Sequence, residues 1–457
     1  MKLIKHSMVL LVCGLLAACG TAGTGASPSA QPAPADTQAT AAPAAAATSA
    51  GETTASGDQI QLRVAWWGSQ NRHDRTLKVI ELFEKSHPNI KIVSEYSNFD
   101  DYWTKLSTQA AGGNLPDVVQ HDYSRIGEWV SQSLLLPLDP YVSDGTIKLE
   151  DVADEQLSGG RVGGKIYGIS LGTNALTVLY DPAKFKAAGL EAPTADWTWT
   201  DFQKSADTIH QKLGIYGVEG FYNIEMLKLY LKERGKWIYN DQGTGLGYTD
   251  DSQVAAFFQL LLDMQASGAM PTREFDAARG TPSLEESLIV SEKSAMLFTW
   301  SNQAVAVANA VKGRELALVQ TPRLDGGSES LYLKPSMFFA IPAKSKNAAA
   351  AAQFIDFFLN SPEANQILAA ERGVPIIPAV RTAIKTDLPP MQQQVFKYIA
   401  EVEAVAAPIN PPDPPTHAKI VAEVYNPLID QLLYGEISAE DAAAQLRTQV
   451  SAILAGK

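Results

Sequence analysis

The sequence is almost without cysteine. Its two cysteines, Cys13 and Cys19, both lie among the first twenty residues. The rest of the chain has no thiol, so disulfide bonds, thiolate metal sites and thiol redox chemistry are excluded from it.

Basic residues are also in deficit. The chain has 37 Lys and Arg against 50 Asp and Glu, a formal net charge of −13. Removal of residues 1–18 would take away two lysines and no acid, which leaves about −15 on the same counting. Because phosphate binding needs clustered Lys and Arg, nucleic acid is not expected as a partner.

Compact motifs of catalysis and cofactor binding are absent as well. The sequence has no H-E-x-x-H, no P-loop and no G-x-G-x-x-G, and its six histidines lack ligand spacing, so no catalytic residue, metal or cofactor is expected. Gly168–Gly172 matches the G-x-S-x-G nucleophile elbow. The elbow requires a helix after the serine, whereas residues 177–180 have strand composition, so the match is interpreted as chance.

One short apolar run stands at the N-terminus. Lys2 and Lys5 precede the apolar residues 8–16, which are too few to span a bilayer and predict a signal peptide over residues 1–18. The following residues, 16–20, read Leu-Ala-Ala-Cys-Gly and resemble the bacterial lipobox. This resemblance implies that Cys19 is lipidated, becomes the mature N-terminus and holds the protein at the outer side of the cell membrane. Cleavage at an ordinary A-x-A-like site is the alternative.

Residues 19–57 have almost no aromatic or aliphatic side chain. They consist mainly of Ala, Thr, Ser, Pro, Gly and Gln, a composition that predicts a disordered tether. A chain of this length reaches roughly 35 Å. About 400 residues follow, which is too many for one core and favours two domains.

The start of the folded region predicts a βαβ unit. Residues 60–67 are rich in branched and aromatic residues, residues 75–86 have an apolar stripe at helical spacing, and residues 90–93 read as a second strand. Residues 69–74 are expected to form a polar loop. Such a unit favours a parallel sheet whose ligand-facing loops lie at the carboxyl ends of the strands. Further strands are predicted over 115–119, 164–169, 177–181, 316–319 and 337–341, and helices over 102–111, 252–266, 347–359 and 362–371.

Several segments together resemble the sugar-type extracellular solute-binding proteins, the family that includes maltose-binding protein. The likeness covers nearly all of the chain after the tether and rests on the order of the segments 66–68 (WWG), 83–92 (FEKSHPNIKI), 111–118 (AGGNLPDV), 164–169 (GKIYGI), 180–181 (YD), 199–202 (WTDF), 294–296 (SAM) before Trp300, and 341–347 (IPAKSKN). The family often has proline where Ser170 stands. The form of residues 66–73 looks like the branch that handles plant-type or other oligosaccharides, so maltose is not carried over as the substrate.

The resemblance implies an α/β protein with the two-lobe, type II periplasmic-binding-protein fold. Each lobe would be a mostly parallel sheet flanked by helices, joined by hinge crossovers near 170–174, 311–316 and 359–362. The N-terminal lobe would comprise residues 58–170 and 312–358, and the C-terminal lobe residues 171–311 and 359–457. The implied function is the capture of a carbohydrate, expected to be an oligosaccharide, by a monomer that closes on it and delivers it to the permease of an ABC importer.

A pyranose needs flat aromatic surfaces and polar hydrogen-bonding partners, which strand-end loops and hinge segments can offer. The residues expected to contact the sugar are Trp67, Ser69, Gln70, Arg72, His73, Asp122, Tyr123, Asn174, Trp300, Tyr332 and Arg372.

Each expected sugar contact has a structural alternative. Trp67 could pack in the core, Arg72 and His73 could be solvated, Asn174 could serve the hinge backbone, and Tyr332 and Arg372 could lie at the surface. Trp197, Trp199 and Trp237 are expected to be structural, and the proline-rich residues 408–415 a surface loop.

Two other functions compete with sugar capture. A secreted carbohydrate-active hydrolase or lyase could hide its paired carboxylates among the fifty acids. The same scaffold could instead bind a polyamine, a peptide or an anion, which would favour acidic pairs or basic clusters in the site. The binding-protein reading predicts micromolar affinity and an unaltered ligand.

Overall fold

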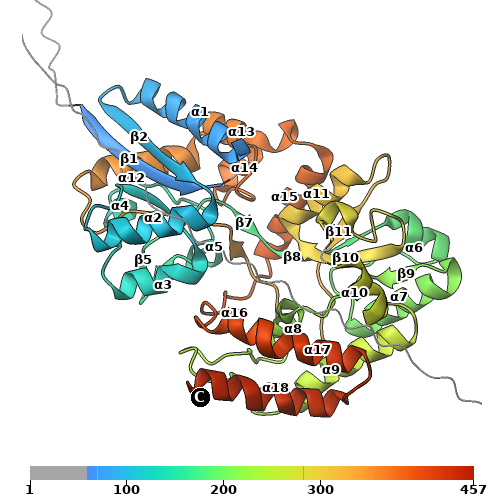
Figure 1. Ribbon diagram of the computed structural model, residues 1–457. Coiled ribbons are helices and arrows are strands. Elements are labelled where there is room, and N and C mark those ends of the chain that lie inside the picture. Colours follow the sequence, from blue (N-terminus) through green and yellow to red (C-terminus); the bar gives the residue numbers. More distant parts are fainter. Residues whose placement is uncertain (1–58, 69, 281, 457) are drawn as a thin grey trace, which may run out of the picture. The chain divides into compact units, whose positions relative to one another are not determined.

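The computed structural model describes residues 59–68, 70–280 and 282–456 (Figure 1). The expected signal peptide, the tether, Cys19 and Ser69 lie outside the described residues. Within the described residues, two main sheets stand in separate hydrophobic clusters, and no helix is long and apolar enough to cross a membrane.

The first sheet has five strands in the order β2-β1-β3-β13-β6. Strands β1 (Ile60–Trp67), β2 (Ile90–Ser97) and β3 (Val118–His121) run parallel, as the predicted βαβ unit requires. Strands β13 (Phe338–Ala340) and β6 (Ile169–Ser170) continue the sheet, and each of their pairings is antiparallel. Half of the pairings in this sheet, those made by β13, therefore depart from the expected parallel arrangement.

Helix α1 (Gln70–Ser86) begins directly after β1 and packs on this sheet through Thr76, Val79, Ile80 and Phe83. The expected loop over residues 69–74 is wrong for its described part, because residues 70–74 form the first turn of this helix. The side-chain amide of Gln70 donates to Asp74 one turn later at 2.7 Å, which supports a polar first turn.

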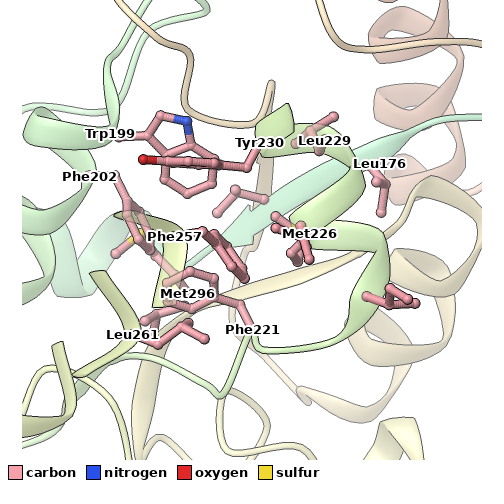
Figure 2. Packing of buried hydrophobic residues seen from close by; sticks show 14 of the residues in the cluster. Leu176, Trp199, Phe202, Phe221, Met226, Leu229, Tyr230, Phe257, Leu261 and Met296 are labelled. Atoms are coloured by element: carbon pink, nitrogen blue, oxygen red, sulfur yellow. The ribbon is translucent and has the colours of Figure 1, made fainter. Parts of the chain in front are cut away.

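The second sheet has the order β11-β8-β10-β9. Strand β8 (Leu176–Tyr180) lies antiparallel between β11 (Ala317–Val319) and β10 (Ser294–Trp300), and only β9 (Tyr216–Val218) pairs in parallel. The expected mostly parallel sheet is therefore wrong for this lobe. The aromatic side chains of Trp199, Phe202, Tyr230 and Phe257 fill the core beside it (Figure 2). This core is large enough to hold the second lobe together without any disulfide.

The two clusters are each assembled from separate stretches of chain. The first gathers buried residues from 62–171 and 337–380, and the second gathers those from 175–333 and 384–450 together with Val374. This organisation is that of the two-lobe α/β fold expected from the resemblance.

Short strands link the two clusters. Strand β7 (Thr173–Asn174) pairs with β12 (Lys334–Pro335), so that Asn174 stands opposite Lys334, and Thr173 also bridges to Val374. Three stretches that are far apart in the sequence therefore meet where the clusters adjoin.

Helices cover the sheets. Helices α9 (Ser252–Ala266), α17 (Asn426–Leu433) and α18 (Ala439–Leu454) pack side by side in the second cluster (Figure 1). The other long helices are α2 (Phe99–Ala111), α3 (Tyr123–Ser131), α7 (Trp199–Leu213), α8 (Ile224–Lys232), α11 (Ser301–Ala310), α12 (Ala348–Asn360) and α15 (Pro390–Glu403).

Helix α13 (Pro362–Leu368) is shorter than the predicted 362–371. It ends because Ala369 and Ala370 both adopt left-handed conformations, with φ of 47° and 54°. An L-residue in this region costs roughly 1–2 kcal/mol, so two in succession mark a strained turn. The turn directs the next residues, Glu371 and Arg372, away from the helix.

Candidate functional site

A cavity of about 210 Å³ lies where the two hydrophobic clusters adjoin. Arg72 of α1 and the turn after α13 contribute from the first cluster, and the ends of β7 and β10 contribute from the second. Its polar and aromatic lining residues are Arg72, Asn174, Trp300, Asn302, Gln303, Lys334, Ser336, Glu371 and Arg372.

Trp300 supplies the aromatic surface of the cavity. It is the last residue of β10, and α11 starts at the next residue. The side-chain oxygen of Gln303 accepts from the Trp300 backbone N–H at 3.2 Å and from Thr299 Oγ1 at 2.9 Å, which fixes this strand-to-helix turn. The position of Trp300 at the start of α11 is therefore fixed by hydrogen bonds.

Lys334 lies against the same ring. Its Nζ stands 4.5 Å from the centroid of the Trp300 ring, a cation–π contact. Since Asn174 is its partner across the β7–β12 ladder, the two side chains emerge on the same face. Asn174 and Lys334 thus approach the cavity together.

Two polar atoms of the cavity wall are buried without a partner. Asn174 Oδ1 and Ser336 Oγ make no hydrogen bond to the described part of the chain, and Asn174 is only 8% exposed. A buried polar group left unpaired costs about 1–3 kcal/mol. An unpaired carbonyl oxygen and an unpaired hydroxyl in one cavity point to a ligand that offers hydrogen bonds.

An arginine-rich network forms another part of the cavity wall. Glu371 accepts from Arg72 Nε at 2.8 and 3.0 Å and from Arg372 Nη1 at 3.3 Å. Arg372 is 3% exposed and also donates to Thr76 Oγ1 at 2.9 Å. Burial, and then the neighbouring Arg72, lower the pKa of Arg372 to about 9. One carboxylate therefore serves two guanidinium groups.

An aromatic run extends from Trp300 to Tyr332 and Trp237. The ring centroids are 6.3 Å apart between Trp300 and Tyr332, and 6.4 Å apart between Tyr332 and Trp237, with edge-on geometry in both pairs. Lys232 Nζ stands 5.5 Å from the Tyr332 ring and 5.4 Å from the Trp237 ring. Burial lowers the pKa of Lys232 to about 8.

Beside this run, Glu225, Asp413 and His417 are the one group of three or more metal-ligating side chains within the described residues. Lys228 Nζ already contacts Glu225 at 2.8 Å and Asp413 at 2.6 Å. The ammonium pairs with both carboxylates, so this arrangement is an internal ion cluster.

The structure brings Arg72, Asn174, Trp300 and Arg372 together in the cavity, and Tyr332 makes edge-on contact with Trp300. These four residues were among the expected sugar contacts, and their role in binding stays a prediction.

The other expected sugar contacts lie elsewhere. Trp67 is 7% exposed and packs on Tyr102 and Trp103. His73 is buried and its Nδ1 accepts from Trp66 Nε1 at 3.1 Å; burial and then Arg72 lower its pKa. Gln70 is exposed at the start of α1.

Asp122 and Tyr123 follow β3 but serve local and long-range backbone bonds. Asp122 caps α3 by accepting from the Ser124 N–H at 2.8 Å. Tyr123 donates its hydroxyl to the carbonyl of Asn410, in the proline-rich stretch 408–415. That stretch therefore contacts the first cluster and is more than a free surface loop.

Sequence reasoning missed Asn302, Gln303, Lys334, Ser336 and Glu371. Asn302 and Gln303 lie two and three residues after Trp300, so the strand-end rule that selected Trp300 would have reached them. Lys334 and Ser336 carried no such signal, because their position depends on pairing with β7, about 160 residues earlier.

Together these features define a two-lobed α/β protein with a polar, aromatic cavity where its lobes meet. Residues 78–396 match the bacterial extracellular solute-binding protein family, and the chain belongs to that family. Members of this family are extracytoplasmic binding proteins.

Individual relatives agree with this assignment. The chain is 26% identical over 168 residues to the multiple sugar-binding protein of Streptococcus mutans, a match that spans 35% of this chain and 38% of that protein. An extracellular solute-binding protein family 1 structure from Alicyclobacillus acidocaldarius is 28% identical, with a TM-score of 0.80 over 87% of this chain and 99% of that one. A periplasmic oligogalacturonide-binding protein from Yersinia enterocolitica, solved with digalacturonic acid, is 25% identical, with a TM-score of 0.68 over 86% and 98%.

Proposed function

We propose that this protein is the carbohydrate-binding component of an ABC importer and captures an oligosaccharide between its two lobes. The observation that carries the proposal is the cavity in which the Trp300 ring stands beside two unpartnered buried polar atoms, Asn174 Oδ1 and Ser336 Oγ. A flat ring covers the C–H face of a pyranose, and the polar atoms bind its hydroxyls. The sugar ligands named for two relatives support this chemistry.

The lobes close by bending at crossovers whose positions follow from cluster membership. Leu171 and Ala175 belong to different clusters, as do Leu333 and Met337. This supports crossovers over 171–175, 333–337 and 374–384. The second and third replace the predicted 311–316 and 359–362, because Val311 and Leu316 pack in the second cluster and Leu359 and Ala364 in the first. Ligand that contacts both sides favours the closed form, which the permease would recognise.

Calorimetry with a panel of neutral and acidic oligosaccharides tests the binding function. We expect a micromolar affinity, about −8 kcal/mol, for at least one sugar. Chromatography of the incubated sugar should return it unchanged. Shortened products would contradict the proposal and favour a hydrolase or lyase. Absence of binding across the panel would exclude a carbohydrate as the ligand.

The N-terminal lipid anchor is part of the same proposal. Diacylglyceryl transfer to Cys19 would hold the protein beside its permease, and the sequence around this residue supports it. We expect membrane fractions to contain the protein, and Cys19→Ser to shift it to the soluble extracytoplasmic fraction. If mass spectrometry finds Cys19 without a lipid in the wild type, the proposed anchor is wrong.

A further inference from the structure

The cavity carries a positive charge that the rest of the chain does not share. Arg72, Lys334 and Arg372 line it, against the single carboxylate of Glu371. The chain as a whole has a net charge of −13, so this group of cations is opposite in sign to the net charge of the protein. The charge of the cavity is a local feature of its lining.

The one carboxylate of the cavity is already engaged by the arginines. Both oxygens of Glu371 lie within 3.0 Å of Arg72 Nε, and one is 3.3 Å from Arg372 Nη1. Lys334, by contrast, makes no ion pair with any carboxylate of the described residues, and its ammonium rests on the Trp300 ring. Lys334 is therefore the cation that a ligand can reach and neutralise.

A second lysine repeats this pattern along the aromatic run. Lys232 also lacks a carboxylate partner within residues 59–456 as described; it donates to the carbonyl of Pro408 at 2.7 Å and to the side-chain oxygen of Asn410. One turn earlier on the same helix, Lys228 is neutralised by two carboxylates, Glu225 and Asp413. Lys232 and Lys334 therefore lack the carboxylate partners that Lys228 has.

From this arrangement we infer that the bound oligosaccharide is acidic, with a uronate ring that stacks on Trp300 and places its carboxylate at Lys334. The aromatic face selects a sugar ring, and the unpaired atoms of Asn174 and Ser336 take up its hydroxyls. The ammonium supplies a charge-assisted hydrogen bond that a neutral sugar cannot use fully. Excess positive charge also rejects polyamines and cationic peptides. The inference rests on the proposed function and names its substrate class.

The experiment compares matched acidic and neutral sugars. Calorimetry uses oligogalacturonic, oligomannuronic and oligoglucuronic acids, the methyl ester of each acid, and neutral oligomers of glucose and galactose of equal length. We expect the tightest binder to be a uronic acid, at least about tenfold tighter than its own methyl ester, since the ester keeps the ring and loses the charge. Added salt should narrow this difference.

Two variants assign the preference to Lys334. Lys334→Gln should reduce the preference for acid over ester to within about threefold, because the charge pairing is lost while a donor remains. Lys397→Gln is the matched control, since Lys397 lies on α15, outside the cavity lining, with a side chain that is 73% exposed, and it should leave the preference unchanged.

The outcomes separate the two proposals. A neutral sugar as tightest binder, or an ester equal to its acid, overturns the acidic ligand and leaves the binding function standing. A sulfated or phosphorylated sugar that binds more tightly than every uronic acid likewise overturns the carboxylate. An acid preference that survives in Lys334→Gln removes Lys334 from the inference. Absence of binding by every sugar rejects both proposals.

Discussion

At the scale of single residues, the site is made by side chains whose environments leave something unsatisfied. Asn174 and Ser336 have buried atoms without partners, Lys334 has a ring in place of a carboxylate, and Arg372 shares Glu371 with Arg72. A core built for stability alone would satisfy such groups. Unpartnered buried atoms also occur elsewhere, for example at Trp103 and His121. The site is marked by their combination with Trp300 and with the unpaired ammonium of Lys334 in one cavity.

Trp300 should contribute affinity more than stability, since its ring lies at the cavity. We expect Trp300→Ala to weaken sugar binding by about 10- to 100-fold, or about 1.5–3 kcal/mol. Trp300→Phe keeps a ring and should lose less. Calorimetry on both variants measures the affinities, and thermal unfolding without ligand is the control. Equal binding by wild type and Trp300→Ala would exclude the stacking role.

Glu233 makes stability depend on pH. It is buried, accepts from Trp199 Nε1 at 2.8 Å, and has its pKa raised by burial to about 7 despite Arg234 at 3.7 Å. The folded state thus holds a proton that the unfolded state releases above pH 4.5. This contribution to stability is complete below about pH 4.5 and is lost as the pH rises through about 7.

Substitution of Glu233 tests the sign of this dependence. Glu233→Gln should remove the pH-dependent loss, so that its stability relative to wild type rises by about 1–3 kcal/mol between pH 4.5 and pH 8. Urea unfolding at the two pH values provides the measurement. A constant difference between variant and wild type would show that the pKa of Glu233 is the same in the folded and unfolded states.

At the scale of elements, strand ends and helix starts set the positions of the site residues. Helix α3 shows that a polar residue at a strand end can be a cap, because Asp122 accepts from Ser124 N–H. We expect Asp122→Ala to cost about 1 kcal/mol of stability and Asp122→Asn to cost little, since asparagine also caps. Sugar affinity should be unchanged in both. A loss of affinity in Asp122→Asn would instead return Asp122 to the ligand contacts.

The sequence predicted the elements better than the orientation of their side chains. The βαβ unit over β1, α1 and β2 followed from composition and helical spacing, and both strands and the helix are present. The first turn of α1 was missed because residues 70–74 are polar, so the apolar repeat begins only after them. Which of Trp66 and Trp67 would be buried could not be decided from alternation, since the last four residues of β1 are all buried.

Only part of the site could be predicted from the sequence. Trp300 and Asn174 stood at segment ends that sequence patterns can locate. Lys334 lies in a two-residue strand whose pairing with β7 spans a long stretch of chain, and no local pattern carries that register. Long-range pairing, rather than propensity, decides which lysine reaches the cavity.

At the scale of the whole molecule, the crossovers touch one another. A methyl group added at Gly172 would lie 2.2 Å from the carbonyl oxygen of Arg372, so two crossing chains meet in backbone contact. Gly172→Ala should force them apart, lower stability by about 1–3 kcal/mol and weaken sugar binding, because Arg372 lines the cavity. Gly127→Ala, inside α3 with open space around it, is the control; it should raise stability by about 0.5–1 kcal/mol and leave sugar affinity unchanged. Thermal unfolding and calorimetry report both effects, and an unchanged Gly172→Ala would show that the hinge does not depend on this contact.

The insertion of β13 between β3 and β6 has a consequence for biogenesis. The first sheet cannot be completed until residues 338–340 have been synthesised, although its other strands are made before residue 171. Until then the nascent chain displays an unpaired strand edge, which exposes it to aggregation and makes it a substrate for holding chaperones.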